Sequence, residues 1–172
     1  MQDIQAQSKT NMAQSDKEIT ITFPDGATRT FPYGVTGADV AESISKSLAK
    51  AAIAVRVNDK QRDLCDPITQ DSHIDIIKLD SDEGLEIMRH TVTAQLLARA
   101  VKTLYPDAEL AIGPTIENGF YYDIDFPEPI SEDELPRIEK EMRRIKESNA
   151  AIQKSLNSKQ ETIKAFKDRD EP

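Results

Sequence analysis

The sequence predicts an α+β protein, with a small sheet domain followed by a mostly helical region. Three observations support this fold class. Apolar residues alternate with polar ones near the N-terminus, as in half-buried strands, and they recur at spacings of three and four further along, as in amphipathic helices. Turn residues separate these stretches repeatedly. The length of 172 residues allows one ordinary domain or two small ones.

The composition restricts the function classes. Charged residues make up 31% of the chain and the formal net charge is −9. Strong autonomous binding to nucleic acid is disfavoured, because it depends on Lys and Arg contacts to phosphate. No apolar run approaches the ~18 residues of a membrane span, and no secretory signal is evident, so we expect a cytoplasmic protein without membrane contact. Cys65 is the single cysteine, which excludes an internal disulfide.

The first predicted domain spans residues 17–80 and follows a polar segment, residues 1–16, which we interpret as a disordered tail. A strand over residues 19–23 leads into the turn Pro24-Asp25-Gly26. The chain then returns over residues 28–31, which completes a predicted hairpin.

A helix and two strands complete this domain. Thr36 and Asp39 stand at capping-box positions, and an apolar stripe carries one helix on to Leu48. Strands are predicted over residues 52–57 and 74–79. The order of two strands, a helix and further strands predicts a small β-grasp, ubiquitin-like domain.

The region from residue 81 to residue 172 begins with a long amphipathic helix over residues 84–105, which Pro106 ends. Next come a short strand over residues 109–112, a turn at Asn118-Gly119 and an alternating strand over residues 120–126.

Two capping boxes and one more strand follow in this region. Ser131 with Glu134 predicts the start of a helix, and Ser158 with Glu161 predicts the start of another. Between these helices, residues 151–156 have the pattern of a strand.

Two sequence stretches resemble one known family. The order RH…AQLLARAVK-LYPDAELAIGP-IENGFYYD is similar to the start of the editing domain in bacterial threonyl-tRNA synthetases. The preceding stretch, FPDG…FPYGVTGADVAESISKSLAKAAIAVRVN, resembles the TGS domain that opens these enzymes. The resemblance covers nearly all of the chain after residue 17. It implies a TGS domain over residues 17–80 and an incomplete editing domain, its N-terminal half, over residues 81–172.

The resemblance singles out His90 as a catalytic residue for editing. Taken alone, a helical histidine is more often exposed or structural. In the family, two histidines at i and i+4 share a helix face and help to hydrolyse the wrong aminoacyl group. The family pattern RHS-x-AHLL reads RHTVTAQLL here, so one residue is inserted and Gln95 replaces the second histidine.

The insertion changes the expected geometry. On a straight α-helix, Gln95 would lie about 140° from His90, against about 40° for residues four apart. A π-turn could absorb the extra residue. The apolar stripe from residue 85 to residue 96 needs no such turn, so we predict a straight helix and weakened editing geometry.

Other residues have competing interpretations. The resemblance assigns Gly113 and Tyr122 to the wall of the editing pocket, whereas the residues alone suggest a tight turn and a packed aromatic ring. Arg137, Lys140 and Arg144 share a helix face that could meet RNA phosphate, but a solvated face with nearby glutamates is favoured.

The resemblance implies a segment of an enzyme that joins threonine to tRNA(Thr) and removes mischarged serine from it. The whole enzyme would use ATP, Mg²⁺ and Zn²⁺, act as a homodimer and bind the acceptor end of tRNA(Thr). This segment would supply the TGS module and part of the editing site, with no cofactor, metal or aminoacylation site of its own. A non-catalytic TGS adaptor that binds a protein or RNA, and a trans-acting editing deacylase, are the alternatives.

Overall fold

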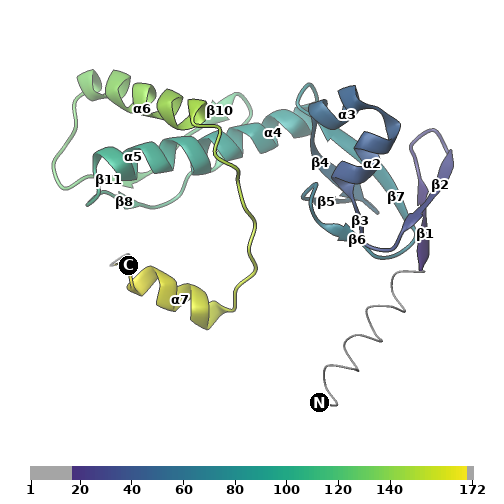
Figure 1. The fold of residues 1–172 in the computed structure, drawn as a ribbon. Coiled ribbons are helices and arrows are strands. Elements are labelled where there is room, and N and C mark those ends of the chain that lie inside the picture. The colour runs from purple at the N-terminus through teal and green to yellow at the C-terminus, as the bar shows by residue number, and fades with distance from the viewer. Residues whose placement is uncertain (1–16, 170–172) are drawn as a thin grey trace, which may run out of the picture. The chain divides into compact units, whose positions relative to one another are not determined.

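The computed structural model describes residues 17–169, so the predicted N-terminal tail lies outside the described residues. The chain forms two compact units, residues 17–95 with 110–124 and residues 96–109 with 125–169. Strands dominate the first unit and helices the second, which confirms the α+β class (Figure 1). No helix in the described part of the chain is long and apolar enough to cross a membrane.

The first unit is built on a five-stranded sheet in the order β2-β1-β7-β4-β5. Its central strands β1 and β7 are parallel, and all other neighbours are antiparallel. The strands are β1 (Glu18–Thr22), β2 (Thr28–Pro32), β4 (Ala52–Val57), β5 (Lys60–Arg62) and β7 (Ser72–Lys78). A separate two-residue ladder pairs β3 (Val35–Thr36) with β6 (Pro67–Ile68). This β-grasp topology agrees with the prediction, apart from the three short strands β3, β5 and β6.

The helical part of this domain is two helices, α2 (Gly37–Ile44) and α3 (Lys46–Ala51), so the prediction of one continuous helix was wrong. Ser45 breaks the helix because its backbone is extended, with φ −166° and ψ 150°. Its hydroxyl accepts a hydrogen bond from the Leu48 N–H at 3.0 Å, as a serine N-cap does. The capping box of Thr36 and Asp39 is confirmed.

The core of the sheet domain consists of aliphatic side chains from alternate strand positions and from α2. Burial of alternate residues follows from the two-residue period of a strand. The buried set comprises Ile19, Ile21, Val35, Val40, Val55, Val57, Ile68 and Ile74.

Helix α4 (Asp82–Thr91) is fixed tightly to the end of β7. A methyl group in place of the Gly84 hydrogen would lie 2.0 Å from the Lys78 carbonyl oxygen, so only glycine fits there. Arg56 on β4 also donates hydrogen bonds to Asp75, at 3.0 Å, and to Glu83 in α4. The start of α4 is therefore attached to the sheet through both backbone and side chains.

The long helix is not a regular α-helix throughout. Helix α4 continues as a π-helical segment, η1 (Val92–Leu97), before α5 (Ala98–Leu104). The prediction of an uninterrupted α-helix was therefore wrong, because an apolar stripe does not reveal one extra residue within a single turn. Pro106 follows the helix closely, and the predicted end is confirmed.

The segment after the helix contains short ladders instead of long strands. β9 (Thr115–Ile116) pairs with β10 (Gly119–Phe120), and β8 (Glu109–Leu110) pairs with β11 (Ile124–Asp125). The predicted strand over residues 120–126 is thus interrupted at residues 121–123. Asp123 still exchanges backbone hydrogen bonds with the opposite segment, at 3.0 Å to the Ala111 N–H and 2.9 Å to the Ile112 carbonyl.

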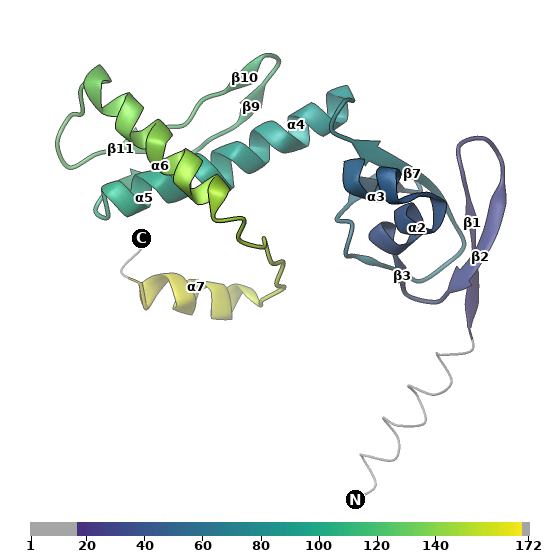
Figure 2. The same ribbon diagram turned by 45° about the horizontal axis from the view of Figure 1, so that its top comes forward.

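In the second unit, α6 (Leu135–Glu147) packs along α5, as both views show (Figures 1 and 2). A short 3₁₀ turn, η2 (Glu132–Glu134), precedes α6. The capping box predicted at Ser131 was wrong, since the Ser131 side chain makes no cap hydrogen bond and the Glu134 carboxylate accepts one from Tyr105 instead.

The last helix, α7 (Lys159–Lys167), starts at the predicted capping box of Ser158 and Glu161, which is confirmed. The strand predicted over residues 151–156 was wrong. That segment is irregular and every residue in it is exposed. A strand needs a pairing partner for its backbone groups, and alternation of residue types cannot supply one.

Candidate functional site

His90 lies in the last turn of α4, and its side chain is exposed. Gln95 lies within the π-helical segment and is also exposed. A π-turn closes its hydrogen bond over five residues instead of four, so each residue turns the helix through a smaller angle. Gln95 is therefore rotated back from the ~140° expected on a straight α-helix, toward the face that carries His90.

Gly113 and Tyr122 lie against each other. A methyl group in place of the Gly113 hydrogen would lie 2.4 Å from Cδ2 of the Tyr122 ring and 2.8 Å from Cγ2 of Thr93. Gly113 is therefore a glycine because two side chains cover its backbone closely. The turn interpretation of Gly113 does not apply, and the packed-ring interpretation of Tyr122 agrees with this contact.

Thr93 joins this cluster to the π-helical segment and was missed from the sequence. Its side chain is 1% exposed, and its hydroxyl donates a hydrogen bond of 2.8 Å to the Arg89 carbonyl oxygen. A hydroxyl that leaves water needs a hydrogen-bond partner, and within a helix the carbonyl four residues earlier supplies one. The available signal was the pair of threonines, Thr91 and Thr93, next to His90.

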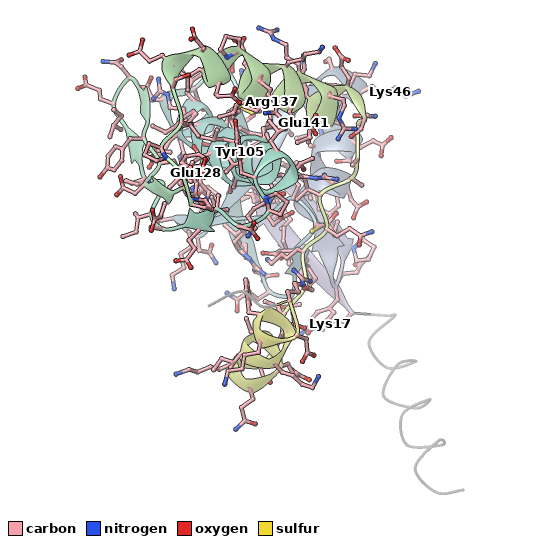
Figure 3. All side chains as sticks on the ribbon, turned by 90° about the vertical axis from the view of Figure 1, so that its left-hand side faces the viewer. Lys17, Lys46, Tyr105, Glu128, Arg137 and Glu141 are labelled. Carbon is pink, nitrogen blue, oxygen red and sulfur yellow. The ribbon has the colours of Figure 1, made fainter. Side chains whose placement is uncertain are left out.

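A second cluster lies in the other unit, around Tyr105. The Tyr105 ring meets Phe126 edge to face, with 5.2 Å between ring centroids, and the Arg137 guanidinium lies 5.7 Å from the Tyr105 centroid. The Tyr105 hydroxyl donates a hydrogen bond to the Glu134 carboxylate, which Arg137 also contacts at 3.1 Å. Figure 3 shows the Tyr105 and Arg137 side chains close together.

Hydrogen bonding in this cluster changes two pKa values. The bond from Tyr105, and then the bond from Arg137, lower the pKa of Glu134, because both stabilise the carboxylate. The same carboxylate raises the pKa of the Tyr105 hydroxyl by accepting its proton in a hydrogen bond. Both shifts come chiefly from the one hydrogen bond between Tyr105 and Glu134.

The Tyr105 cluster forms one side of a groove of about 590 Å³. Three prolines line it beside the rings, and three carboxylates face a single guanidinium. The charged lining residues are Asp107, Glu128, Glu134 and Arg137. A net negative lining disfavours a phosphate-containing ligand in this groove.

On the basic face of α6, Arg137 and Arg144 are paired with carboxylates. Arg144 binds Glu141 through three hydrogen bonds of 2.6 to 3.0 Å, and Arg137 binds Glu134. The Arg144 contact lowers the pKa of Glu141. These ion pairs agree with the solvated face that the sequence favoured over an RNA contact.

The remaining candidates for reactive or metal-binding chemistry are unremarkable. Cys65 is exposed, and a hydrogen bond with Asp63 raises the pKa of its thiol, which makes it a poorer nucleophile. Among residues 17–169, no three His, Cys, Asp or Glu side chains are grouped so that they could hold a metal ion.

Comparison with known proteins identifies both parts of the chain. The TGS domain family matches residues 19–78. The threonine--tRNA ligase of Anoxybacillus flavithermus is 49% identical over 154 residues, which is 90% of this chain and 24% of that protein. The ligase of Rhizobium johnstonii is 48% identical over 89% of the chain, and threonine--tRNA ligase 1 of Bacillus subtilis is 46% identical over 86%.

The chain spans about a quarter of the length of the curated relatives that it matches. The similarity extends well beyond the TGS domain, through the π-helical segment and the short ladders that follow. Residues 19–78 therefore form a TGS domain, and the chain corresponds to the N-terminal region of bacterial threonine--tRNA ligases.

Proposed function

We propose that this chain is the N-terminal segment of an enzyme that attaches threonine to tRNA(Thr) with ATP. This proposal rests on the sequence identity of 46–49% to threonine--tRNA ligases over 86–90% of the chain. The rest of the enzyme, a class II aminoacyl-tRNA synthetase, would supply the aminoacylation site with its ATP, Mg²⁺ and Zn²⁺. The parent enzyme would be a cytoplasmic homodimer.

Within this enzyme, the segment contributes part of a site that hydrolyses mischarged Ser-tRNA(Thr). His90 is exposed, and an imidazole can hold or activate water near neutral pH. Gln95 can donate and accept hydrogen bonds but cannot exchange a proton. In this proposal Gly113 and Tyr122 form part of the wall of the site, and the close packing of Thr93 and Tyr122 on Gly113 supports it.

If the chain were a non-catalytic TGS adaptor, its similarity to threonine--tRNA ligases would be expected to end with the TGS domain. The matched region continues over nearly all of the chain, including His90, Gln95, Gly113 and Tyr122. This extent favours the ligase over the adaptor.

A chimeric enzyme tests the proposal. The present chain replaces the matching segment of the Anoxybacillus flavithermus ligase, and threonylation of tRNA(Thr) and hydrolysis of Ser-tRNA(Thr) are measured separately. We expect threonylation to be retained. We expect serine hydrolysis to be slower than in the parent ligase, because Gln95 cannot replace a histidine in proton transfer.

His90→Ala in the chimera distinguishes the two activities. We expect threonylation to stay unchanged and the remaining serine hydrolysis to fall by about 10²-fold or more, as for loss of an acid–base group. Serine hydrolysis that is independent of His90 would contradict the editing role. Loss of threonylation in a folded, dimeric chimera would contradict the assignment of the segment itself.

A further inference from the structure

The π-helical segment needs a structural cause. π-Helical turns are rare and occur mostly as single turns inside α-helices. A regular α-helix would satisfy the same backbone groups, so side-chain contacts must favour the wider turn. Thr93 is the buried polar side chain in this part of the helix, with 1% of its surface exposed.

Thr93 is held from two directions. Its hydroxyl donates a hydrogen bond of 2.8 Å to the Arg89 carbonyl, in the preceding turn of the helix. Its methyl group lies over Gly113, where a side chain would be only 2.8 Å away, and Gly113 also lies beneath the Tyr122 ring. Position 113 must therefore be a glycine for Thr93 to seat at this depth.

We propose that Thr93 is a positioning residue that holds the π-turn and so brings Gln95 toward the face of His90. The inserted residue and Gln95 then belong to one arrangement: the extra residue is absorbed in the wider turn, and the side chain five positions after His90 takes the place of one four positions after it. The functional meaning of this pair rests on the proposed editing role, but the geometry itself does not.

An engineered metal-binding pair shows directly which residue lies on the same helix face as His90. Two histidines on one face, one helical turn apart, form a chelating pair for divalent metals. Gln95→His would complete such a pair with His90 if the turn is π-helical, and Ala94→His would do so if the helix is a regular α-helix. Positions 90, 94 and 95 are all exposed, so both variants leave the packing intact.

The probe is Ni²⁺ added to the untagged 172-residue chain, with affinity measured by calorimetry. The wild type gives the baseline binding by its two histidines, His73 and His90. We expect Gln95→His to bind Ni²⁺ roughly tenfold or more tightly than Ala94→His. Equal affinities, or tighter binding by Ala94→His, would overturn the proposed register.

The role of Thr93 is tested in the same two backgrounds. Thr93→Val keeps the buried volume but removes the hydroxyl. We expect this change to reduce or reverse the difference in Ni²⁺ affinity between Gln95→His and Ala94→His. A preference unchanged by Thr93→Val would show that Thr93 does not hold the turn. If Thr93→Val unfolds the chain, nuclear Overhauser contacts between the His90 ring and the Gln95 amide of the unmodified chain decide the register, and their absence overturns the proposal.

These outcomes are independent of catalysis. A failed chelation test removes the positioning role of Thr93 and leaves the editing function to be judged from the chimera. Correct chelation with no His90-dependent serine hydrolysis would keep the geometry and remove the proposed function.

Discussion

At the scale of single residues, two positions are glycine because other groups lie close to their backbone, and not because their backbone angles require glycine. Gly84 and Gly113 both have ordinary backbone angles, yet each lies where another group excludes a side chain. Backbone oxygen excludes it at Gly84, and a tyrosine ring with a threonine methyl excludes it at Gly113. Their identity therefore depends on contacts between segments distant in sequence, which neighbouring residues do not reveal.

Gly113→Ala is expected to destabilise the first unit by about 1–3 kcal/mol, because the new methyl group overpacks against Tyr122 and Thr93. The free energy of unfolding in urea measures this. Gly119→Ala is the matched control, since no atom lies within 4 Å of its added methyl group. Equal stabilities of the two variants would show that the cluster at Gly113 can yield without cost.

The Tyr105–Glu134 contact predicts a dependence of stability on pH. Folding lowers the pKa of Glu134 through the hydrogen bond from Tyr105, so the contribution is present above the unfolded pKa and is lost as pH falls through the folded one. We expect wild type and Glu134→Gln to differ in unfolding free energy at pH 7, and the difference to shrink at acidic pH. If the difference in unfolding free energy between the two proteins did not change with pH, the effect of Glu134→Gln on stability would come from packing and not from the charge.

At the scale of elements, helix starts have local causes and helix interruptions do not. The capping boxes at Thr36 and Ser158 are each formed by two residues three apart, so the sequence predicts both. Ser131 has the same spacing with Glu134, but Tyr105 takes the Glu134 carboxylate. Competition from a residue 29 positions away cannot be read from a capping pattern.

The two confirmed caps predict different consequences. Thr36→Ala is expected to lower global stability by about 1 kcal/mol, because the α2 residue Val40 belongs to the sheet core. Ser158→Ala should reduce the helicity of α7 alone, since every described residue of α7 is exposed. Urea unfolding and residue-level amide chemical shifts report the two effects. A global loss of stability from Ser158→Ala would show that α7 is packed.

The choice of His90 and Gln95 as site residues comes from the resemblance and stays a prediction. The structure shows that both side chains are exposed. The π-turn was not predicted, because the apolar residues from 85 to 96 fit a regular helix equally well. Its cause is the contact of Thr93 with Gly113, and contacts between distant segments lie outside any periodicity argument.

At the scale of the whole molecule, burial is unevenly divided. The sheet domain contains a continuous cluster of large aliphatic residues, whereas the second unit buries few side chains larger than alanine. Those larger ones are Val101, Ile138 and Ile145. Since apolar burial is the main stabilising term, the two units should differ in stability.

Amide hydrogen exchange tests this difference. Amides of β4 and β7 are expected to exchange more slowly than those of α6, because opening α6 exposes less apolar surface. Measurement at neutral pH by mass spectrometry resolves the two regions. Identical protection in the sheet and in α6 would indicate that the whole chain unfolds as one cooperative body.

The exposed segment between α6 and α7 has a practical consequence for anyone who purifies this protein. Residues 150–158 are irregular and exposed, so a protease can bind them in extended form without first opening a helix or a sheet. Trypsin should cut after Lys154 before it attacks the sheet domain. The first nick would release α7 as a peptide and leave the TGS domain and His90 in the larger product.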